Sequence, residues 1–268
     1  MQNASDLLWD CWQQGRRLSV IPADIAPRTR EEGYAVQARL EGRSAAPLFG
    51  WKIAATSAAG QAHINVTGPL AGRLLHERAI DLSRRSGDAA GAAKAEATLP
   101  FGVNHMKVAE AEFAFRMGRD LPPRPSPYTV DEVLASVATL HPAIEVPDSR
   151  FDDFTIVGAP QLIADNACAH QFVLGLATTA DWRALDLVAH RAIGTAGSFT
   201  REGKGANVLG DPRVALAWLA NELSGLGITL KAGQVVTTGT CLVPLPIQPG
   251  DVITMDFGVL GDLTARMI

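Results

Sequence analysis

Two kinds of hydrophobic pattern alternate along this sequence. In the first kind, apolar residues lie on one face of an amphipathic helix, and this pattern covers residues 4–17 and 211–226. Capping threonines, Thr29 and Thr129, begin two further helical segments over residues 29–41 and 129–140. We therefore expect two helices at the start of the chain and two more in its second half.

The second kind of pattern consists of short apolar or alternating runs, which are typical of strands. Between the runs, residues 56–78 and the glycine-rich residues 194–210 are expected to form loops, and residues 83–98 an exposed loop or insertion. Strands mixed with few helices predict an α+β fold built on a mixed sheet. We place a helical N-terminal subdomain at 1–47 and the second domain at 48–268. The expected strands are 48–54, 106–118, 141–146, 185–193, 235–240, 252–257 and 263–268.

Three glutamates fall within two of these strands. Glu110 and Glu112 are two residues apart, so a strand directs both side chains to one face, and Glu145 follows in the next strand. Like charges on one face repel unless a cation lies between them. Three carboxylates without a neighbouring cysteine or histidine suit a hard divalent cation such as Mg²⁺ or Mn²⁺. The alternative is that Glu110 and Glu112 face solvent on an edge strand.

Lys52 lies inside an apolar strand, where a lysine is costly unless it is paired or its head reaches water. It is either a surface lysine or a cation directed at an anionic ligand. Asp165 and Asn166 follow a short apolar run and either turn the chain there or face the same site.

Composition narrows the range of partners. The 268-residue chain is 47% hydrophobic and carries a net charge of −4, with no basic tract, so we expect no nucleic-acid partner. No apolar run approaches the roughly 20 residues that cross a membrane. The three cysteines are far apart, which predicts neither a disulfide framework nor a zinc site and favours the reducing cytoplasm.

Six short motifs occur in order along the chain. They are Gly50-Trp51-Lys52-Ile53, Glu110-Ala111-Glu112, His141-Pro142-Ala143-Ile144-Glu145, Ala164-Asp165-Asn166-Ala167, Thr238-Gly239-Thr240 and Pro249-Gly250-Asp251. Taken together, over roughly residues 48–268, this set resembles the hydratase/decarboxylase branch of the fumarylacetoacetate hydrolase superfamily. The resemblance implies a mixed β-roll or barrel-like catalytic core with a helical N-terminal part, assembled as a homo-oligomer.

The resemblance also implies roles for individual residues. Glu110, Glu112 and Glu145 would hold Mg²⁺ or Mn²⁺, and Lys52 would reach the oxo-acid end of a small 2-oxo or 2-hydroxydienoic acid. The expected substrate-binding residues, besides Lys52, are Asp165, Gly239 and Thr240.

The implied reaction is hydration of 2-hydroxypenta-2,4-dienoate to 4-hydroxy-2-oxopentanoate in aromatic catabolism. Two other enzyme reactions stay open, namely decarboxylation of a 4-oxalocrotonate-type 2-oxo acid and C–C hydrolysis of an acylpyruvate. A further alternative is a non-catalytic partner subunit of a hydratase/decarboxylase complex.

One motif departs from the family pattern. Hydratase members would have Pro-Asp-Phe-Gly about 18 residues after the lysine, with the aspartate as acid/base, whereas this chain has Pro69-Leu70-Ala71-Gly72. Leu70 cannot transfer a proton. Histidine has a suitable pKa for the task, so His63 and His105 are our catalytic candidates. The wider set of possible substitutes, each of which could instead be a surface or packing residue, is His63, His76, Glu77 and His105.

Overall fold

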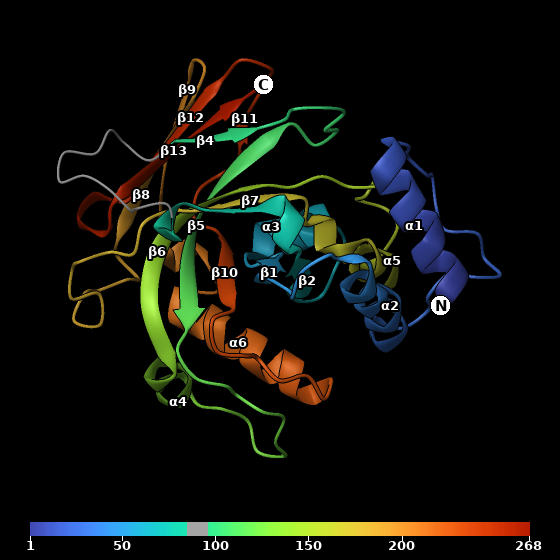
Figure 1. The fold of residues 1–268 in the computed structure, drawn as a ribbon, viewed down its shortest axis with the longest axis horizontal. Coiled ribbons are helices and arrows are strands. Elements are labelled where there is room, and N and C mark those ends of the chain that lie inside the picture. The colour runs from blue at the N-terminus through green and yellow to red at the C-terminus, as the bar shows by residue number, and fades with distance from the viewer. Residues whose placement is uncertain (85–95) are drawn as a thin grey trace.

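The computed structural model describes residues 1–84 and 96–268, and it contains two β-sheets flanked by helices (Figure 1). The expected α+β architecture on mixed sheets is confirmed. Most of the loop expected at 83–98, namely residues 85–95, lies outside the described residues.

The larger sheet carries the three glutamates. It is mixed, because β1 pairs in parallel with β10 and β3 with β7, while the other pairs are antiparallel. The long central strands β5 and β6 curve visibly in Figure 1. From edge to edge the order is β2 (Leu70–Leu74), β1 (Gly50–Ala54), β10 (Val235–Thr240), β5 (Val108–Met117), β6 (Val137–Val146), β7 (Gln171–Leu174) and β3 (Ala79–Asp81), with β11 (Leu245–Pro246) paired to the start of β5.

The smaller sheet lies on the side away from the N-terminal helices in Figure 1. Only one of its strand pairs, β4 with β13, is parallel. Its order is β4 (Glu96–Leu99), β13 (Asp262–Met267), β12 (Val252–Asp256), β8 (Arg191–Ala196) and β9 (Phe199–Lys204).

The helices differ in length and position. The first ends where Gly15 adopts a left-handed φ of 63°, a conformation that glycine allows without strain. Among the described residues, none of the helices is both long and apolar enough to cross a membrane. The α-helices are α1 (Gln2–Gln14), α2 (Arg30–Gln37), α3 (Ala58–His63), α4 (Val130–Ala135), α5 (Ala159–Ala164) and α6 (Pro212–Gly225). Short 3-10 helices cover Ala38–Arg43, His76–Arg78, Leu82–Arg84, Asn166–Cys168, Gly205–Asn207 and Gly258–Leu260.

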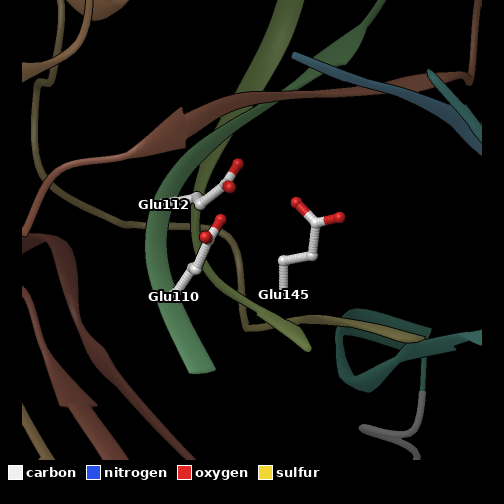
Figure 2. A group of neighbouring side chains, drawn as sticks. All are labelled: Glu110, Glu112 and Glu145. Atoms are coloured by element: carbon white, nitrogen blue, oxygen red, sulfur yellow. The ribbon is translucent and has the colours of Figure 1, made fainter. Parts of the chain in front are cut away.

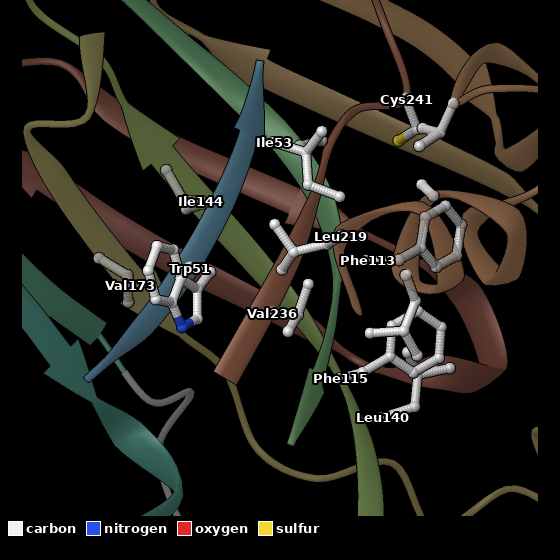
Figure 3. Packing of buried hydrophobic residues seen from close by; sticks show 14 of the residues in the cluster. Trp51, Ile53, Phe113, Phe115, Leu140, Ile144, Val173, Leu219, Val236 and Cys241 are labelled. Atoms are coloured by element: carbon white, nitrogen blue, oxygen red, sulfur yellow. The ribbon is translucent and has the colours of Figure 1, made fainter. Parts of the chain in front are cut away.

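The alternation of residues along β5 separates the core from the site. Phe113 and Phe115 point to one face, where they join a buried cluster that includes Trp51 of β1 and Leu219 of α6 (Figure 3). Burying each such side chain contributes about 1.5–3 kcal/mol. Glu112, immediately before Phe113, alternates with these residues and projects to the opposite face. The core therefore fixes the strand, and the strand fixes where the glutamates point.

The N-terminal helices pack onto the rest of the chain. Leu8 of α1 and Val36 of α2 form a buried cluster with Phe151 and Ala164. A boundary near residue 47 stays a prediction.

The structure corrects three expected element boundaries. The helix expected at 129–140 ends at Ala135, because residues from Val137 onward pair with β5. The loop expected at 56–78 contains α3 and the fully buried strand β2, which pairs with β1. The strand expected at 185–193 begins only at Arg191, and the glycine-rich stretch that follows forms most of a hairpin with β9.

Candidate metal centre and its cavity

Glu110, Glu112 and Glu145 converge on one point. In the pairing of β5 with β6, Glu110 stands directly opposite Glu145, and Glu112 is one repeat further along the same face. One carboxylate oxygen from each residue lies within 4.8 Å of the others. Figure 2 shows the three side chains directed toward one another. The structure therefore brings together the three residues that the sequence singled out.

Several oxygens of this group lack partners. Glu112 Oε2 accepts hydrogen bonds from the backbone N–H of Gly239, at 2.8 Å, and from the hydroxyl of Thr237. Among the described residues, no hydrogen-bond donor reaches Glu112 Oε1 or Glu145 Oε2, and Glu145 Oε1 has the ammonium group of Lys52 as its neighbour. Buried carboxylate oxygens without partners are costly, and a divalent cation is the group that offsets this cost. The donor set and its unpaired oxygens therefore fit a hard metal ion.

The electrostatics of the group point the same way. Burial, followed by the neighbouring charge of Glu145, raises the pKa of Glu110 to about 7. Burial and the two neighbouring carboxylates raise the pKa of Glu112 well above its usual range, and burial also raises that of Glu145. Three carboxylates in this arrangement resist ionisation unless positive charge is supplied.

Lys52 supplies one positive charge. Its Nζ lies 3.1 Å from Glu145 Oε1 and donates a hydrogen bond of 3.0 Å to the carbonyl oxygen of Ala167. Burial alone would lower the pKa of Lys52, but the charges of Glu145, Glu110 and Glu112 outweigh burial and raise it. Lys52 is 3% exposed, so the expected alternative of a surface lysine is wrong.

The Ala167 carbonyl oxygen, which accepts the hydrogen bond from Lys52, belongs to an unusual turn. Asn166, Ala167 and Cys168 all have left-handed φ angles, between 50° and 61°, which are uncommon for residues other than glycine. Asp165 anchors this turn, since it accepts hydrogen bonds from Ser149, at 2.8 Å, and from the Arg150 backbone N–H, and pairs with the Arg150 side chain.

Asp165 does not contact the cavity. Its side chain is 1% exposed and its oxygens are occupied by Arg150 and Ser149, so the structure places it behind the site rather than against a substrate. Of the two sequence-based alternatives, Asp165 stabilises a turn of the chain.

A cavity of about 680 Å³ opens from the carboxylates. Glu110, Lys52 and Thr240 line it, and so does Leu70 at the position of the missing aspartate. Gly239 is packed against Thr56, because a Cβ added at Gly239 would lie 2.3 Å from the Thr56 hydroxyl oxygen. Thr240 is thus at the cavity wall, while Gly239 serves the site through its backbone N–H to Glu112.

The four candidate proton carriers are spread apart. His63, at the end of α3, lines the cavity and is exposed at its rim. His105 is exposed and bonded through Nε2 to the carbonyl oxygen of Asp152, at 3.1 Å, outside the cavity wall. His76 and Glu77 are exposed in a short 3-10 helix that does not line the cavity.

Two contributors escaped the sequence analysis. The first is Thr237, whose hydroxyl donates a hydrogen bond to Glu112. In the sequence it is one residue of a β-branched strand, but it stands two positions before Gly239, and this spacing could have indicated that both lie on the face of the site. The carbonyl oxygen of Ala167 carries no signal in the sequence, because any residue offers a carbonyl there.

The whole chain has recognisable relatives. Residues 82–268 match the family described as "Fumarylacetoacetate (FAA) hydrolase C-terminal", so the chain belongs to the fumarylacetoacetate hydrolase family. It is therefore a member of a family of enzymes.

Individual relatives narrow the comparison. The chain is 30% identical over 266 residues to a 2-keto-4-pentenoate hydratase of Paraburkholderia xenovorans, covering 98% of this chain and 93% of that protein. It is 31% identical to a 4-oxalocrotonate decarboxylase of a Pseudomonas species, covering 92% and 89%. In fold it is similar to a 4-oxalocrotonate decarboxylase of Pseudomonas putida solved with magnesium and adipate, with a TM-score of 0.85, 24% identity, and coverage of 100% and 97%.

Proposed function

We propose that this protein is a divalent-metal-dependent hydro-lyase that hydrates a 2-hydroxy-2,4-dienoate to a 4-hydroxy-2-oxo acid. 2-Hydroxypenta-2,4-dienoate is the simplest such substrate. The observation that carries the proposal is the pair of buried carboxylate oxygens without a hydrogen-bond donor, Glu112 Oε1 and Glu145 Oε2, close to Lys52 and to a cavity that Lys52 and Glu110 line. Similarity to hydratases over nearly the whole chain supports it.

Glu110, Glu112 and Glu145 would hold the metal, and we propose Mg²⁺ or Mn²⁺ because the donors are all hard oxygens. A similar fold solved with magnesium, and again with calcium, supports an ion of this class. When bound, the ion would act as a Lewis acid toward the oxygens of the 2-oxo acid.

Lys52 would hold the substrate's oxo-acid end through hydrogen bonds from its ammonium group. The surrounding carboxylates raise the pKa of Lys52, which favours its charged ammonium form. Its role is to stabilise the negative charge that develops on the enolate oxygen. The Ala167 carbonyl and Glu145 fix the direction of the ammonium group.

Hydration also needs a group that moves a proton to the far carbon of the dienoate and takes one from water at carbon 4. Leu70 cannot do so. His63 is the candidate that lines the cavity, and we propose it for this role. Its exposure at the rim gives it contact with solvent, from which the proton and the water both come.

Decarboxylation of a 4-oxalocrotonate-type acid is the second candidate. Leu70 favours it, because loss of carbon dioxide from a 2-oxo acid needs the same charge stabilisation but no group that activates water. The 31% identity to a 4-oxalocrotonate decarboxylase supports this alternative.

One experiment separates the candidates. The purified protein with Mg²⁺ is incubated with 2-hydroxypenta-2,4-dienoate and, separately, with 4-oxalocrotonate, and the products are identified by NMR and by carbon dioxide release. Formation of 4-hydroxy-2-oxopentanoate without carbon dioxide supports the hydro-lyase. Carbon dioxide from the diacid supports the decarboxylase, and turnover of neither substrate by metal-loaded protein contradicts both. Assembly as a homo-oligomer is a further proposal, which light scattering on the same sample tests.

A further inference from the structure

The cavity is larger than a five-carbon acid requires. Its volume of about 680 Å³ falls in the range of roughly 300–1,000 Å³ that accommodates ligands of drug size. Lys52 and Glu110 form one part of its wall, and the other lining residues surround space beyond the part of the substrate that reacts.

The wall of this outer space is apolar. Met106 just before β5, Ile64 after α3, and Phe154 and Leu162 on the segment around α5 contribute larger side chains. Leu70 extends the same surface toward the reaction centre, where it is fully buried. Burial of a substrate's hydrocarbon against such a wall stabilises the complex, by about 25 cal/mol per Å² of apolar surface removed from water.

Positive charge is scarce along this wall. Among the described residues that line the cavity, Lys52 is the lone lysine and there is no arginine, and Lys52 is already paired with Glu145. A carboxylate at the far end of a substrate would lose its hydration without gaining a partner, which is strongly unfavourable.

The rim adds a further obstacle to a negative tail. His63 packs edge-on against Phe154, with 5.9 Å between the ring centroids, and the exposed Asp152 and Asp153 immediately precede Phe154. Among the described residues that line the cavity, His63 is the one group besides Lys52 that can carry a positive charge, and the carboxylate of Asp153 is close enough to interact with it electrostatically.

From this geometry, and resting on the proposed function, we infer that the natural substrate carries an uncharged hydrocarbon tail beyond its dienoate, such as a propyl or larger alkyl chain or a phenyl ring. The tail lies against Met106 and Phe154, which act as specificity-determining residues. Diacid substrates are disfavoured by the same wall.

Binding of stable 2-oxo acids tests this inference without relying on turnover. Calorimetric titrations of the Mg²⁺-loaded protein compare 2-oxopentanoate with 2-oxooctanoate, and 2-oxohexanoate with 2-oxohexanedioate. We expect the eight-carbon acid to bind at least about 10-fold more tightly than the five-carbon acid, and the diacid at least about 10-fold more weakly than the monoacid of the same length. Equal affinities, no affinity for any of the acids, or tighter binding of the diacid would overturn the inference.

Two variants localise the effect. Met106→Arg should reverse the preference between 2-oxohexanoate and 2-oxohexanedioate, whereas the control Ile156→Arg, at an exposed position away from the cavity, should leave it unchanged. Phe154→Ala should reduce the gain from chain length. If neither cavity variant alters the preferences, the tail does not lie where we place it. Turnover of 2-hydroxypenta-2,4-dienoate is measured separately, so failure of the hydro-lyase proposal and failure of this inference give different results.

Discussion

Nζ of Lys52 lies 3.1 Å from Oε1 of Glu145, and the two side chains are 4% and 0% exposed. This buried ion pair places a positive charge beside the three carboxylates. It leaves Glu145 Oε2 available to a ligand, since no hydrogen-bond donor among the described residues reaches that oxygen. Charge compensation is therefore partial, which leaves the site suited to a cation and an anionic substrate together.

Replacing Lys52 should separate substrate activation from metal binding. Lys52→Met should lower kcat by about 100-fold or more, because a preorganised donor to the developing charge is lost. Affinity for Mg²⁺ should stay the same or rise, since a neighbouring positive charge is removed. Lys204→Met, at an exposed position on β9, is the control. Loss of metal binding together with activity in Lys52→Met would show that the lysine merely supports the structure.

The ion pair between Asp165 and Arg150 should stabilise the fold. Both side chains are at most 1% exposed, and removal of one partner leaves the other charge buried and unpaired. Asp165→Asn should therefore lower the free energy of unfolding by about 3 kcal/mol, as measured by urea denaturation. Asp24→Asn, at an exposed position, should change it by less than about 0.5 kcal/mol. Equal effects of the two variants would contradict this role.

Gly239 should tolerate no side chain. Its φ is +94°, and an added Cβ would lie 2.3 Å from the Thr56 hydroxyl oxygen. Gly227 is a matched control, because its φ is +72° but nothing lies within 4 Å of an added Cβ. Gly227→Ala should cost about 1 kcal/mol of stability from backbone strain alone. Gly239→Ala should cost clearly more and weaken metal binding through Glu112, and similar thermal midpoints for the two variants would refute the steric argument.

His170 should make stability depend on pH. It accepts a 2.9 Å hydrogen bond from Trp12 Nε1, and burial, with the nearby Arg150, Arg78 and Arg17, lowers its pKa to about 3. In the unfolded chain the pKa of His170 is about 6.5, so between pH 6.5 and pH 3 the unfolded state binds a proton at His170 more readily than the folded state does. The stability that neutral His170 contributes is therefore fully present above pH 6.5 and is lost as the pH falls toward 3.

The difference between wild type and His170→Gln isolates this contribution from other titrating groups. Wild type should lose on the order of 3 kcal/mol more stability than His170→Gln between pH 7 and pH 4, measured by urea denaturation. Parallel pH profiles for the two proteins would show that His170 is not buried as a neutral group.

The sequence was informative where side-chain periodicity determines geometry. Glu110 and Glu112 had to share a face once their stretch was a strand, and the hydrophobic neighbours Trp51 and Ile53 had to send Lys52 to the opposite face. These alternations indicated which side chains share a face of the strands, whereas the mixed sheet was predicted from the many short strands with few helices.

Other features depend on contacts between distant segments. The apolar residues after Ala135 suit a helix or a strand equally, and pairing with β5 decides for the strand. Asp165 had a motif but no visible partner, because Arg150 precedes it by 15 residues and meets it only in the folded chain. The Ala167 carbonyl that orients Lys52 is a backbone group and cannot be recognised from residue type.

The central claim is that Glu110, Glu112 and Glu145 form one divalent-cation site. Calorimetric titration of chelator-treated protein with MnCl₂ and MgCl₂ tests it most directly, with Glu145→Gln and Glu112→Gln as site variants and the exposed Glu202→Gln as control. We predict one ion per chain in wild type and in Glu202→Gln, and affinity at least about 100-fold weaker in either site variant. Unchanged affinity in Glu145→Gln and Glu112→Gln, or no ion bound by wild type, would contradict the account.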